Sequence, residues 1–286
     1  MKTRAVGCLV LLLALFANAG WAGEGVIEIN QASVLAAGGF PFTINQSGSY
    51  RLTSDLVVPD VNKGGIVISS KSVTLDLGGF GIRGPVTCTD DGFASRKNSA
   101  CSPVGNGKGI SVSAGTAVIR NGFVRGMGSS GISISSGLST IVEHVVVEEN
   151  GSHGIILNAG LLVDSAVRFN GGDGVWYCDC GFGAPSQIER NVVERNRGAG
   201  IHLGRGAVKE NLIFFNGGAG VLAVAFAGNA PNVVGNTIYS NTGNGISAPE
   251  GIYRDNLLRS NGTTPSGHQV AGSITDGGGN SCAPAC

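Results

Sequence analysis

Apolar residues along this chain occur in short runs that are separated by Gly and Asn at a regular interval. The phrase Asn-x-x-x-x-Asn begins at four positions, namely Asn191, Asn211, Asn236 and Asn256. In the first three copies the fourth residue after the second Asn is a Gly, and a β-branched residue follows it. These glycines are Gly200, Gly220 and Gly245. An internal repeat of this length indicates a solenoid, whose units bury their apolar faces by stacking on one another.

The Gly-Ile/Val pair recurs over most of the chain and sets the length of one turn. Its glycines are residues 65, 109, 131, 154, 174, 200, 220 and 245. Neighbouring pairs are 20 to 26 residues apart, except for one step of 44 that holds a large loop from Pro85 to Asn106. Each turn contains three short apolar runs, such as 201–203, 207–209 and 212–214, and Gly or Asn marks their ends. Because helical periodicity is missing, we predict three short strands per turn.

The first Asn of the phrase is expected to turn the chain between the second and third strands. Asn tolerates the left-handed backbone conformation that a sharp bend requires. At a strand spacing of about 4.8 Å, stacked Asn amides can also bond to one another as a ladder. Asn121, Asn191, Asn211, Asn236 and Asn256 fit this column, whereas Val145 and Ser165 interrupt it, so the ladder should be broken in the middle. The Gly before each first strand is expected to allow a similarly close corner.

Through its coils Asn-x-x-x-x-Asn-x-x-x-Gly-Ile/Val, the chain resembles the right-handed parallel β-helix proteins of the pectate-lyase-like group. The stretches beginning at Gly48 and Val73 also resemble the opening coils of uncharacterised bacterial exported members. The resemblance implies an all-β fold, a single-stranded right-handed parallel β-helix (solenoid) of about eight to nine coils. We divide the chain into a signal peptide at 1–22, an N-terminal cap and first coil at 23–58, the β-helix at 59–262 and a C-terminal tail at 263–286.

The first residues have the features of a signal peptide. Lys2 and Arg4 precede an apolar run from Val6 to Phe16, and small residues that suit signal peptidase follow it. The run is too short to span a bilayer, and no later segment resembles a membrane span. We therefore predict a secreted or periplasmic protein. Without the leader the chain has 17 basic and 19 acidic residues, a net charge of −2, so nucleic acid is not expected as a partner.

Six cysteines follow the leader, and an even number in an exported chain indicates disulfides first. The simplest connectivity pairs neighbours: Cys88 with Cys101, Cys178 with Cys180, and Cys282 with Cys286. The second pair would need a tight turn to reach disulfide geometry. Cys178 and Cys180 with His202 or His153 would also suit copper or zinc, but an oxidising compartment favours the disulfide. We therefore expect neither a metal nor a cofactor.

Polar and aromatic side chains gather on adjacent coils where the repeat is least regular. The middle residue of each first strand should point outward, and this column is Val67, Ser111, Ser133, Ile156, Trp176, His202, Leu222 and Ser247. The column before the Gly is Lys108, Ser130, His153, Asp173, Ala199, Ala219 and Asn244. His153, Asp173 and His202 are candidates for proton transfer. Candidate substrate-binding residues are Trp176, Tyr177, Asp179, Arg197 and Arg205, because aromatic rings stack on sugars and Arg binds carboxylates.

The sequence motifs of known enzymes in this group are incomplete here. Polygalacturonase-like members use Asn-x-Asp, Asp-Asp, Gly-His-Gly and Arg-x-Lys. In this chain Asp90-Asp91 falls in the large loop, Ser152-His153-Gly154 matches only in part, and Arg-x-Lys is missing. Calcium-dependent pectate lyases need clustered carboxylates, which the outward column lacks. Whether the protein is an enzyme therefore stays open.

Two functional hypotheses follow from these patterns. The first is an exported β-helix that binds a polysaccharide or cell-surface glycan through its first-strand face and also cleaves or epimerises it. The alternative is a non-catalytic surface or envelope protein that acts as a spacer or adhesin. Phe169, Phe214 and Phe215 are interpreted as packing or as a self-association patch, and the oligomeric state stays open.

Overall fold

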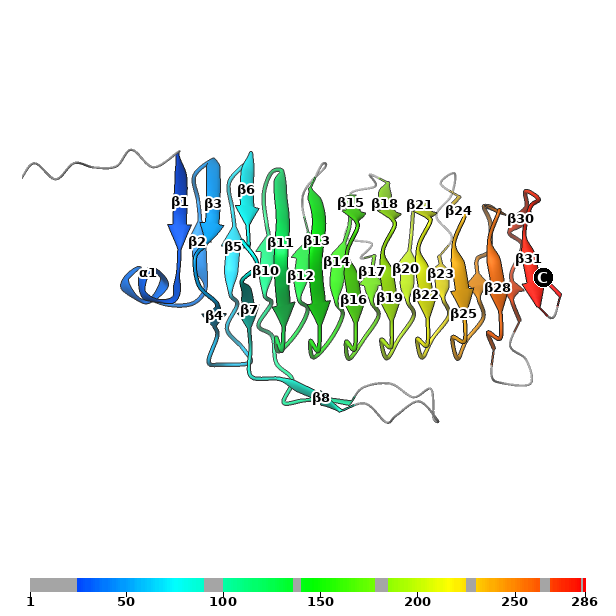
Figure 1. Ribbon diagram of the computed structural model, residues 1–286, viewed down its shortest axis with the longest axis horizontal. Helices are drawn as coiled ribbons and strands as arrows, with labels where there is room; N and C mark the ends of the chain where they lie inside the picture. The colour runs from blue at the N-terminus through cyan, green and yellow to red at the C-terminus, as the bar shows by residue number, and fades with distance from the viewer. Residues whose placement is uncertain are drawn as a thin grey trace, which may run out of the picture.

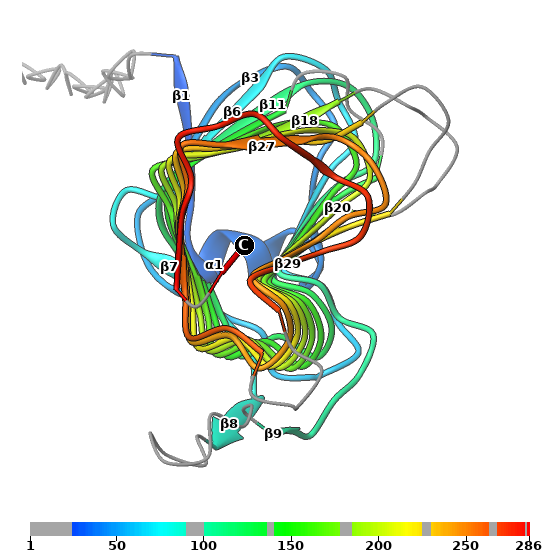
Figure 2. The same cartoon turned by 90° about the vertical axis from the view of Figure 1, so that its right-hand side faces the viewer.

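The structure is a computed structural model that describes residues 25–89, 100–135, 140–177, 185–224, 230–262, 268–283 and 285–286. Over these residues the chain winds into coils that stack along one axis, from the blue N-terminal end to the red C-terminal end (Figure 1). Seen end-on, the coils superimpose and enclose a common core (Figure 2). The predicted all-β parallel solenoid is thus confirmed. The predicted signal peptide and the Cys178–Cys180 pair lie outside the described residues.

The first strands of successive coils form a ten-stranded parallel sheet, which we call the first-strand face. Eight of its strands follow the Gly-Ile/Val pairs, and β2 and β29 add a coil at each end. The strands are β2 (Phe42–Ile44), β5 (Ile66–Ile68), β10 (Ile110–Val112), β12 (Ile132–Ile134), β14 (Ile155–Leu157), β17 (Val175–Trp176), β20 (Ile201–Leu203), β23 (Val221–Ala223), β26 (Ile246–Ser247) and β29 (Val270–Ala271).

A 19-stranded sheet supplies the other two faces, because it bends at a corner between the second and third strands. The second-strand face holds β1 (Val26–Ile29), β3 (Gly48–Leu52), β6 (Val73–Asp76), β15 (Gly160–Val163), β18 (Ser186–Glu189), β21 (Gly206–Lys209), β24 (Asn232–Val234), β27 (Ile252–Arg254) and β30 (Thr275–Asp276). The third-strand face holds β4 (Leu56–Val57), β7 (Gly81–Arg83), β16 (Ala166–Arg168), β19 (Val192–Glu194), β22 (Leu212–Phe214), β25 (Thr237–Tyr239), β28 (Leu257–Arg259) and β31 (Ser281–Ala283). Two long strands, β11 (Ala117–Arg125) and β13 (Ile141–Glu148), continue across the corner.

Buried and half-exposed side chains alternate along these short strands, and the buried ones form the core. In β14, for example, Ile155 and Leu157 are buried while Ile156 between them is half-exposed. Parallel pairing in register places like positions above one another, so Ile110, Ile132 and Ile155 form one inward row. All three are 0% exposed. Each coil therefore buries its apolar side chains against the coils before and after it.

Both ends of the stack are closed by local structure. At the N-terminal end the short helix α1 (Gln31–Ala36) is capped by Asn30, and its Val34 is fully buried. At the C-terminal end β29, β30 and β31 pair with β26, β27 and β28, so the stack continues beyond residue 262. The predicted Cys282–Cys286 disulfide is present there. In the described part of the chain, no helix combines the length and the apolar character needed to cross a membrane.

The corner between second and third strands differs from the prediction in which residue takes the left-handed conformation. Positive φ occurs at the residue before the Asn, for example at Arg190 (54°) and Glu210 (55°). Asn121, with φ of 61°, is equivalent to these preceding residues and not to the repeat Asn. The residue equivalent to the repeat Asn in that coil is Gly122, which pairs with Val145. The prediction that the repeat Asn itself makes the bend was therefore wrong. The Asn is instead needed for the hydrogen bonds that its buried amide makes.

The ladder itself is present and is longer at one end than expected. The amides of Asn191, Asn211, Asn236, Asn256 and Asn280 bond to one another in sequence. Ser165 extends the row, because its backbone N–H donates to Asn191 Oδ1 and its hydroxyl accepts from the Val145 N–H. Serine therefore substitutes for Asn as an acceptor, and the expected break at residue 165 does not occur.

A second ladder, which the sequence analysis did not assign, lies at the turn after the third strand. It contains Asn150, Asn170, Asn196, Asn216, Asn241 and Asn261, and it ends on Gln269. Five of its six Asn residues are 0% exposed. Each carboxamide oxygen accepts from the previous rung, and each amide nitrogen donates onward to the next rung. In the first three copies of the repeated phrase the second Asn is therefore the more deeply buried of the two.

The repeat glycines are required for space and not for backbone conformation. Gly200 is not among the residues with positive φ. A Cβ added there would lie 2.6 Å from Ile213 Cγ2 and 2.8 Å from Asn216 Nδ2. Gly174 and Gly220 have the same neighbours in their own coils. The Asn ladder thus occupies the volume that a side chain at these positions would need.

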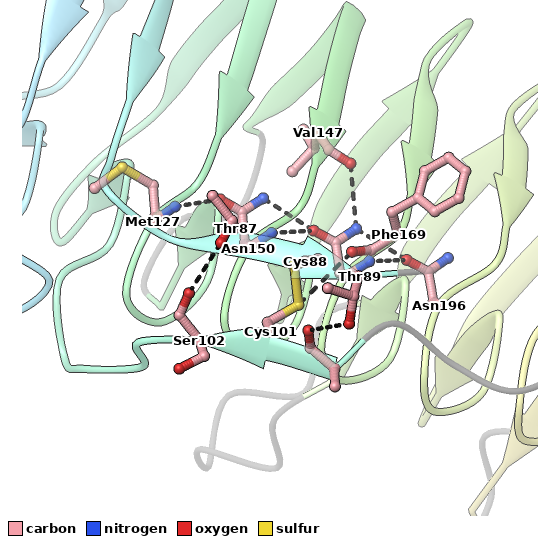
Figure 3. The surroundings of a disulfide bond; sticks show 12 residues. Thr87, Cys88, Thr89, Cys101, Ser102, Met127, Val147, Asn150, Phe169 and Asn196 are labelled. Atoms are coloured by element: carbon pink, nitrogen blue, oxygen red, sulfur yellow. Dashed lines mark hydrogen bonds between the residues drawn. A yellow bond between two sulfur atoms is a disulfide. The ribbon is translucent and has the colours of Figure 1, made fainter. Parts of the chain in front are cut away.

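The large loop of residues 85–106 contains a hairpin that lies beside the stack. Strands β8 (Thr87–Thr89) and β9 (Ala100–Ser102) pair antiparallel, and the predicted Cys88–Cys101 disulfide joins them (Figure 3). A Cβ added to Gly171 would lie 3.3 Å from Cys101 Sγ, and one added to Gly151 would lie 3.0 Å from Val104 Cγ1. The hairpin therefore rests on the turns that lead into β14 and β17.

Candidate functional site

The structure brings four of the predicted residues together on three adjacent coils. Trp176 on β17 pairs in register with His202 on β20. His153 and Asp173 stand at the turns that lead into β14 and β17, two residues before each strand begins. Figure 2 shows that the outline of the coils bends inward where these turns meet the first-strand face. Trp176 and His202 on strands, and His153 and Asp173 on turns, thus lie close together.

Asp173 is the centre of this cluster. Its Oδ1 accepts a hydrogen bond of 2.7 Å from the backbone N–H of Ala199 on the next coil. Its Oδ2 lies 3.3 Å from His202 Nδ1 and 3.8 Å from His153 Nδ1. The side chain is only 16% exposed, so the carboxylate is held by the protein more than by water. It therefore sits between the two histidines in a fixed orientation.

The hydrogen bonds assign opposite tautomers to the two histidines. His153 Nδ1 accepts the backbone N–H of Asp173 at 3.0 Å, so the proton of the neutral ring is on Nε2. His202 Nδ1 faces the Asp173 carboxylate, which accepts only, so this nitrogen carries the proton and Nε2 has a free lone pair. The cluster therefore offers one N–H donor and one basic nitrogen.

Burial keeps His153 neutral. The pKa of His153 lies below its ordinary value, chiefly because the ring is removed from water; Asp173 opposes this shift and His202 adds to it. One face of the ring stacks on Trp176, with centroids 4.8 Å apart and planes 7° from parallel. His153 therefore covers one face of the Trp176 indole, and the Trp176 side chain as a whole is half-exposed.

The other predicted binding residues differ from one another in their placement. The Tyr177 side chain is buried, with 5% exposure, and its ring fills the place where a Cβ of Gly204 would stand. It therefore offers no open stacking face, contrary to the expectation. Arg197 lies exposed in the turn before β20, and Arg205 follows the end of the same strand. Asp179 lies outside the described residues.

Lys108 is a further residue of this face that the sequence analysis placed in the column without giving it a role. Its Nζ donates to Ser133 Oγ at 3.2 Å, on the strand that pairs with β14. The ammonium group is thus carried one coil toward His153. A positive charge in the same column as His153 and Asp173 was the signal that could have identified it.

The metal alternative finds no support from the described residues. Within those ranges, no group of three or more His, Cys, Asp or Glu is arranged to hold a metal ion. The two cysteines of that hypothesis, Cys178 and Cys180, lie outside them. His153 is also committed through Nδ1 to a backbone N–H. The described part of the site is therefore organised by hydrogen bonds.

The lowered pKa of His153 predicts how stability depends on pH. The unfolded chain takes up a proton on this ring near the ordinary value of about 6.5, and the folded chain only at lower pH. The contribution of the neutral ring is therefore complete above that pH and is lost as pH falls through the folded pKa. Urea unfolding at a series of pH values should show this slope, and His153→Gln should reduce it.

Nitrogen-15 NMR of the two rings provides the direct measurement. We expect His153 as the Nε2–H tautomer and His202 as the Nδ1–H tautomer at neutral pH. A His153 ring that titrates at or above its ordinary pKa would contradict the assignment.

Comparison with known proteins agrees with the fold. The family described as "Right handed beta helix region" matches residues 43–207, more than half of the chain. The protein therefore belongs to this family, and its fold is a right-handed parallel β-helix. No curated protein matches the sequence.

Several solved structures share this architecture at low sequence identity. The pectate lyase Pel9A is 14% identical, with 87% of this chain and 72% of that chain covered and a TM-score of 0.55. The A-module of the Azotobacter vinelandii mannuronan C-5 epimerase AlgE4 is 14% identical, with 81% and 72% covered and a TM-score of 0.51. The AlgE6 A-module from the same organism is 16% identical, with 91% and 81% covered and a TM-score of 0.50. At these identities the likeness concerns the fold.

Proposed function

We propose that this protein is an exported β-helix that binds a polysaccharide along the first-strand face. The observation that carries the proposal is the convergence of Trp176, His153, Asp173 and His202 on three adjacent coils. Exposed or half-exposed aromatic and charged groups held on a rigid sheet suit a ligand that extends from coil to coil. The fold neighbours that are named as a pectate lyase and as mannuronan epimerases support a polymer ligand.

The arrangement of charges favours an acidic polymer. Lys108 carries its ammonium group toward the cluster from one side, and Arg197 lies exposed at the turn beside it on the other. Both can form charge-assisted hydrogen bonds with sugar carboxylates. The half-exposed indole of Trp176 would pack on one sugar ring between them. A uronic-acid polymer is thus the ligand class that best fits the described residues.

The two histidines give this site the means for proton transfer. The free Nε2 of His202 can accept a proton from a bound sugar, because Asp173 stabilises the imidazolium that forms. The Nε2–H of His153 can donate to a leaving or developing oxygen. A base and a donor on the two coils that flank the Asp173 coil are the groups that cleavage or epimerisation of a uronate requires. We therefore propose that the protein processes the polymer that it binds.

A panel of immobilised polysaccharides tests this proposal in two steps. We expect binding to acidic polymers, and in solution either a new unsaturated end or a change in sugar configuration. Asp173→Asn should retain binding but lose turnover, since His202 loses the partner that fixes its tautomer. Binding without any product would favour the non-catalytic surface protein. Neither binding nor product across uronic-acid polymers would refute the proposal.

A further inference from the structure

The disulfide hairpin has no role in the proposed function, although it lies beside the coils that carry the candidate site. It consists of β8 and β9, joined by the Cys88–Cys101 bond. Residues 103–107, which we call the return segment, connect β9 to Lys108. Figure 2 shows β8 and β9 outside the outline of the stacked coils, next to the turns between the third and first strands.

The return segment lies against the turn that leads to His153. Val104 Cγ1 would lie 3.0 Å from a Cβ added to Gly151, two residues before His153. The same Cβ would lie 3.1 Å from the carbonyl carbon of Gly128 on the preceding coil. Gly151 is therefore packed against both the return segment and the preceding coil, and a side chain at this position would displace one of them.

The disulfide itself lies against the turn that leads to Asp173, one coil farther along. Cys101 Sγ is 3.9 Å from the carbonyl oxygen of Phe169, where this turn begins (Figure 3). A Cβ added to Gly171 would lie 3.3 Å from the same sulfur atom and 3.0 Å from the carbonyl carbon of Gly151. The disulfide hairpin and its return segment thus contact the turns of two site residues that lie on adjacent coils.

A row of backbone hydrogen bonds also connects the return segment to these turns. The Gly107 carbonyl accepts the Ser129 N–H at 2.8 Å. The row continues from coil to coil, because the Ser129 carbonyl accepts the Ser152 N–H at 3.0 Å and the Ser152 carbonyl accepts the Gly172 N–H at 2.8 Å. Ser152 and Gly172 are the residues directly before the histidine and the carboxylate of the site. A displacement of the return segment is therefore passed to both turns through the main chain.

The return segment ends at Lys108, the cationic residue of the candidate site. The Gly107 N–H donates to the Val61 carbonyl at 2.8 Å, which fixes the end of the segment on the loop before β5. The disulfide hairpin and its return segment are thus linked to three residues that the proposed function places at the ligand.

The placement of His153 and Asp173 is sensitive to the position of their turns. His153 Nδ1 accepts the backbone N–H of Asp173 at 3.0 Å, so a displacement of either turn lengthens the bond that fixes the His153 tautomer. On the inner side the two turns are held by Asn150 and Asn170, whose amides bond at 2.9 Å. On the outer side they are held by the disulfide hairpin. A site loses much of its activity when its groups move by about 1 Å.

We propose that the disulfide hairpin is a positioning element, and that the Cys88–Cys101 bond keeps it in place against the turns of His153 and Asp173. The bond is needed because β8 and β9 have three residues each, and a two-stranded hairpin of this size is barely stable alone. The inference rests on the proposed function for the ligand only, since the geometry of the two side chains can be measured without one.

NMR of the free protein without this disulfide tests the proposal. The variant combines Cys88→Ser with Cys101→Ser, so that neither thiol is left to pair elsewhere. We expect the Ser152 and Gly172 amides to exchange with solvent about tenfold faster or more, because their turns open more often. The pKa of His153 should rise toward its ordinary value as the ring regains water, and part of its population should take the Nδ1–H tautomer.

The matched control combines Cys282→Ser with Cys286→Ser. This disulfide lies at the C-terminal end of the stack, on β31 and the residues after it (Figure 1). Its removal should leave the exchange of Ser152 and Gly172 and the titration of His153 unchanged. A merely structural hairpin would lower the melting temperature of the Cys88 and Cys101 variant with those amides and His153 unchanged, and this result would overturn the proposal.

Val104→Ala decides the question if the variant without the Cys88–Cys101 bond does not fold. Val104 is 61% exposed, so its truncation should leave the fold intact while removing the contact with Gly151. We expect the titration of His153 to move in the same direction by a smaller amount. An unchanged His153 in this variant would refute the positioning role.

Affinity for a uronic-acid polymer separates this inference from the proposed function. We expect the variant without the Cys88–Cys101 bond to bind the polymer about tenfold more weakly than the natural chain. An altered His153 in a protein that binds no such polymer would support the positioning role and refute the proposed function. An unchanged His153 would refute the positioning role, whether or not the polymer binds.

Discussion

Replacing Asn216 by Ala is expected to destabilise the protein by about 3 kcal/mol or more. Its carboxamide oxygen accepts the backbone and side-chain N–H groups of Asn196, both at 3.0 Å. Its amide nitrogen donates to the Val193 carbonyl at 3.0 Å and to Asn241 Oδ1 at 3.0 Å. The residue is 0% exposed, so water cannot replace these partners without opening the turn. Urea unfolding followed by circular dichroism gives the free energy directly.

The comparison variant is Asn232→Ala. Asn232 is half-exposed on the outward side of β24, in the same stack but outside both ladders. We expect its free energy of unfolding to change by only a few tenths of a kcal/mol. Equal losses for Asn216→Ala and Asn232→Ala would contradict the ladder account. Gly200→Ala supplies an independent check, because its Cβ would be forced against Asn216 Nδ2 and Ile213 and should destabilise by about 1–3 kcal/mol.

Replacing Trp176 by Ala is expected to weaken glycan binding strongly while leaving the melting temperature nearly unchanged. The indole is half-exposed, and its loss removes the ring that would pack on a sugar. It also removes the stacking partner of His153, but His153 keeps its hydrogen bond from the Asp173 N–H. We expect a fall in affinity of about a hundredfold, the value of one lost aromatic contact in a small site. Affinity electrophoresis in gels that contain the polymer measures it.

Leu222→Ala is the matched control for Trp176→Ala. Leu222 occupies the same outward column two coils farther along, on β23. Its removal should affect neither affinity nor folding to a measurable extent. A large loss of stability in Trp176→Ala would instead assign the indole to structure. Equal affinity of the two variants would show that the ligand, if one binds, lies elsewhere on the protein.

The sequence determined the architecture because stacking requires every coil to carry the same pattern. Gly-Ile/Val pairs and Asn residues at intervals of about 20 residues predicted the coils correctly. The even number of cysteines predicted two of the disulfides correctly. The same periodicity placed His153, Asp173, Trp176 and His202 on adjacent coils. In a parallel stack in register, neighbours in space are the residues one turn apart. Proximity along the axis could therefore be predicted without coordinates.

The tertiary structure decided the backbone conformation at the corners, the contacts across each coil and the hydrogen bonds between side chains. Only the folded backbone showed that Arg190 and Glu210, and not the Asn after them, take the left-handed conformation. Burial of Tyr177 behind Gly204 depends on how one coil closes on the next, which the pattern of one strand does not contain. The tautomers of His153 and His202 likewise follow from partners that belong to the Asp173 backbone and carboxylate. A repeat fixes which residues are neighbours, while the direction of each side chain is set by packing and hydrogen bonds that exist only once the coils are stacked.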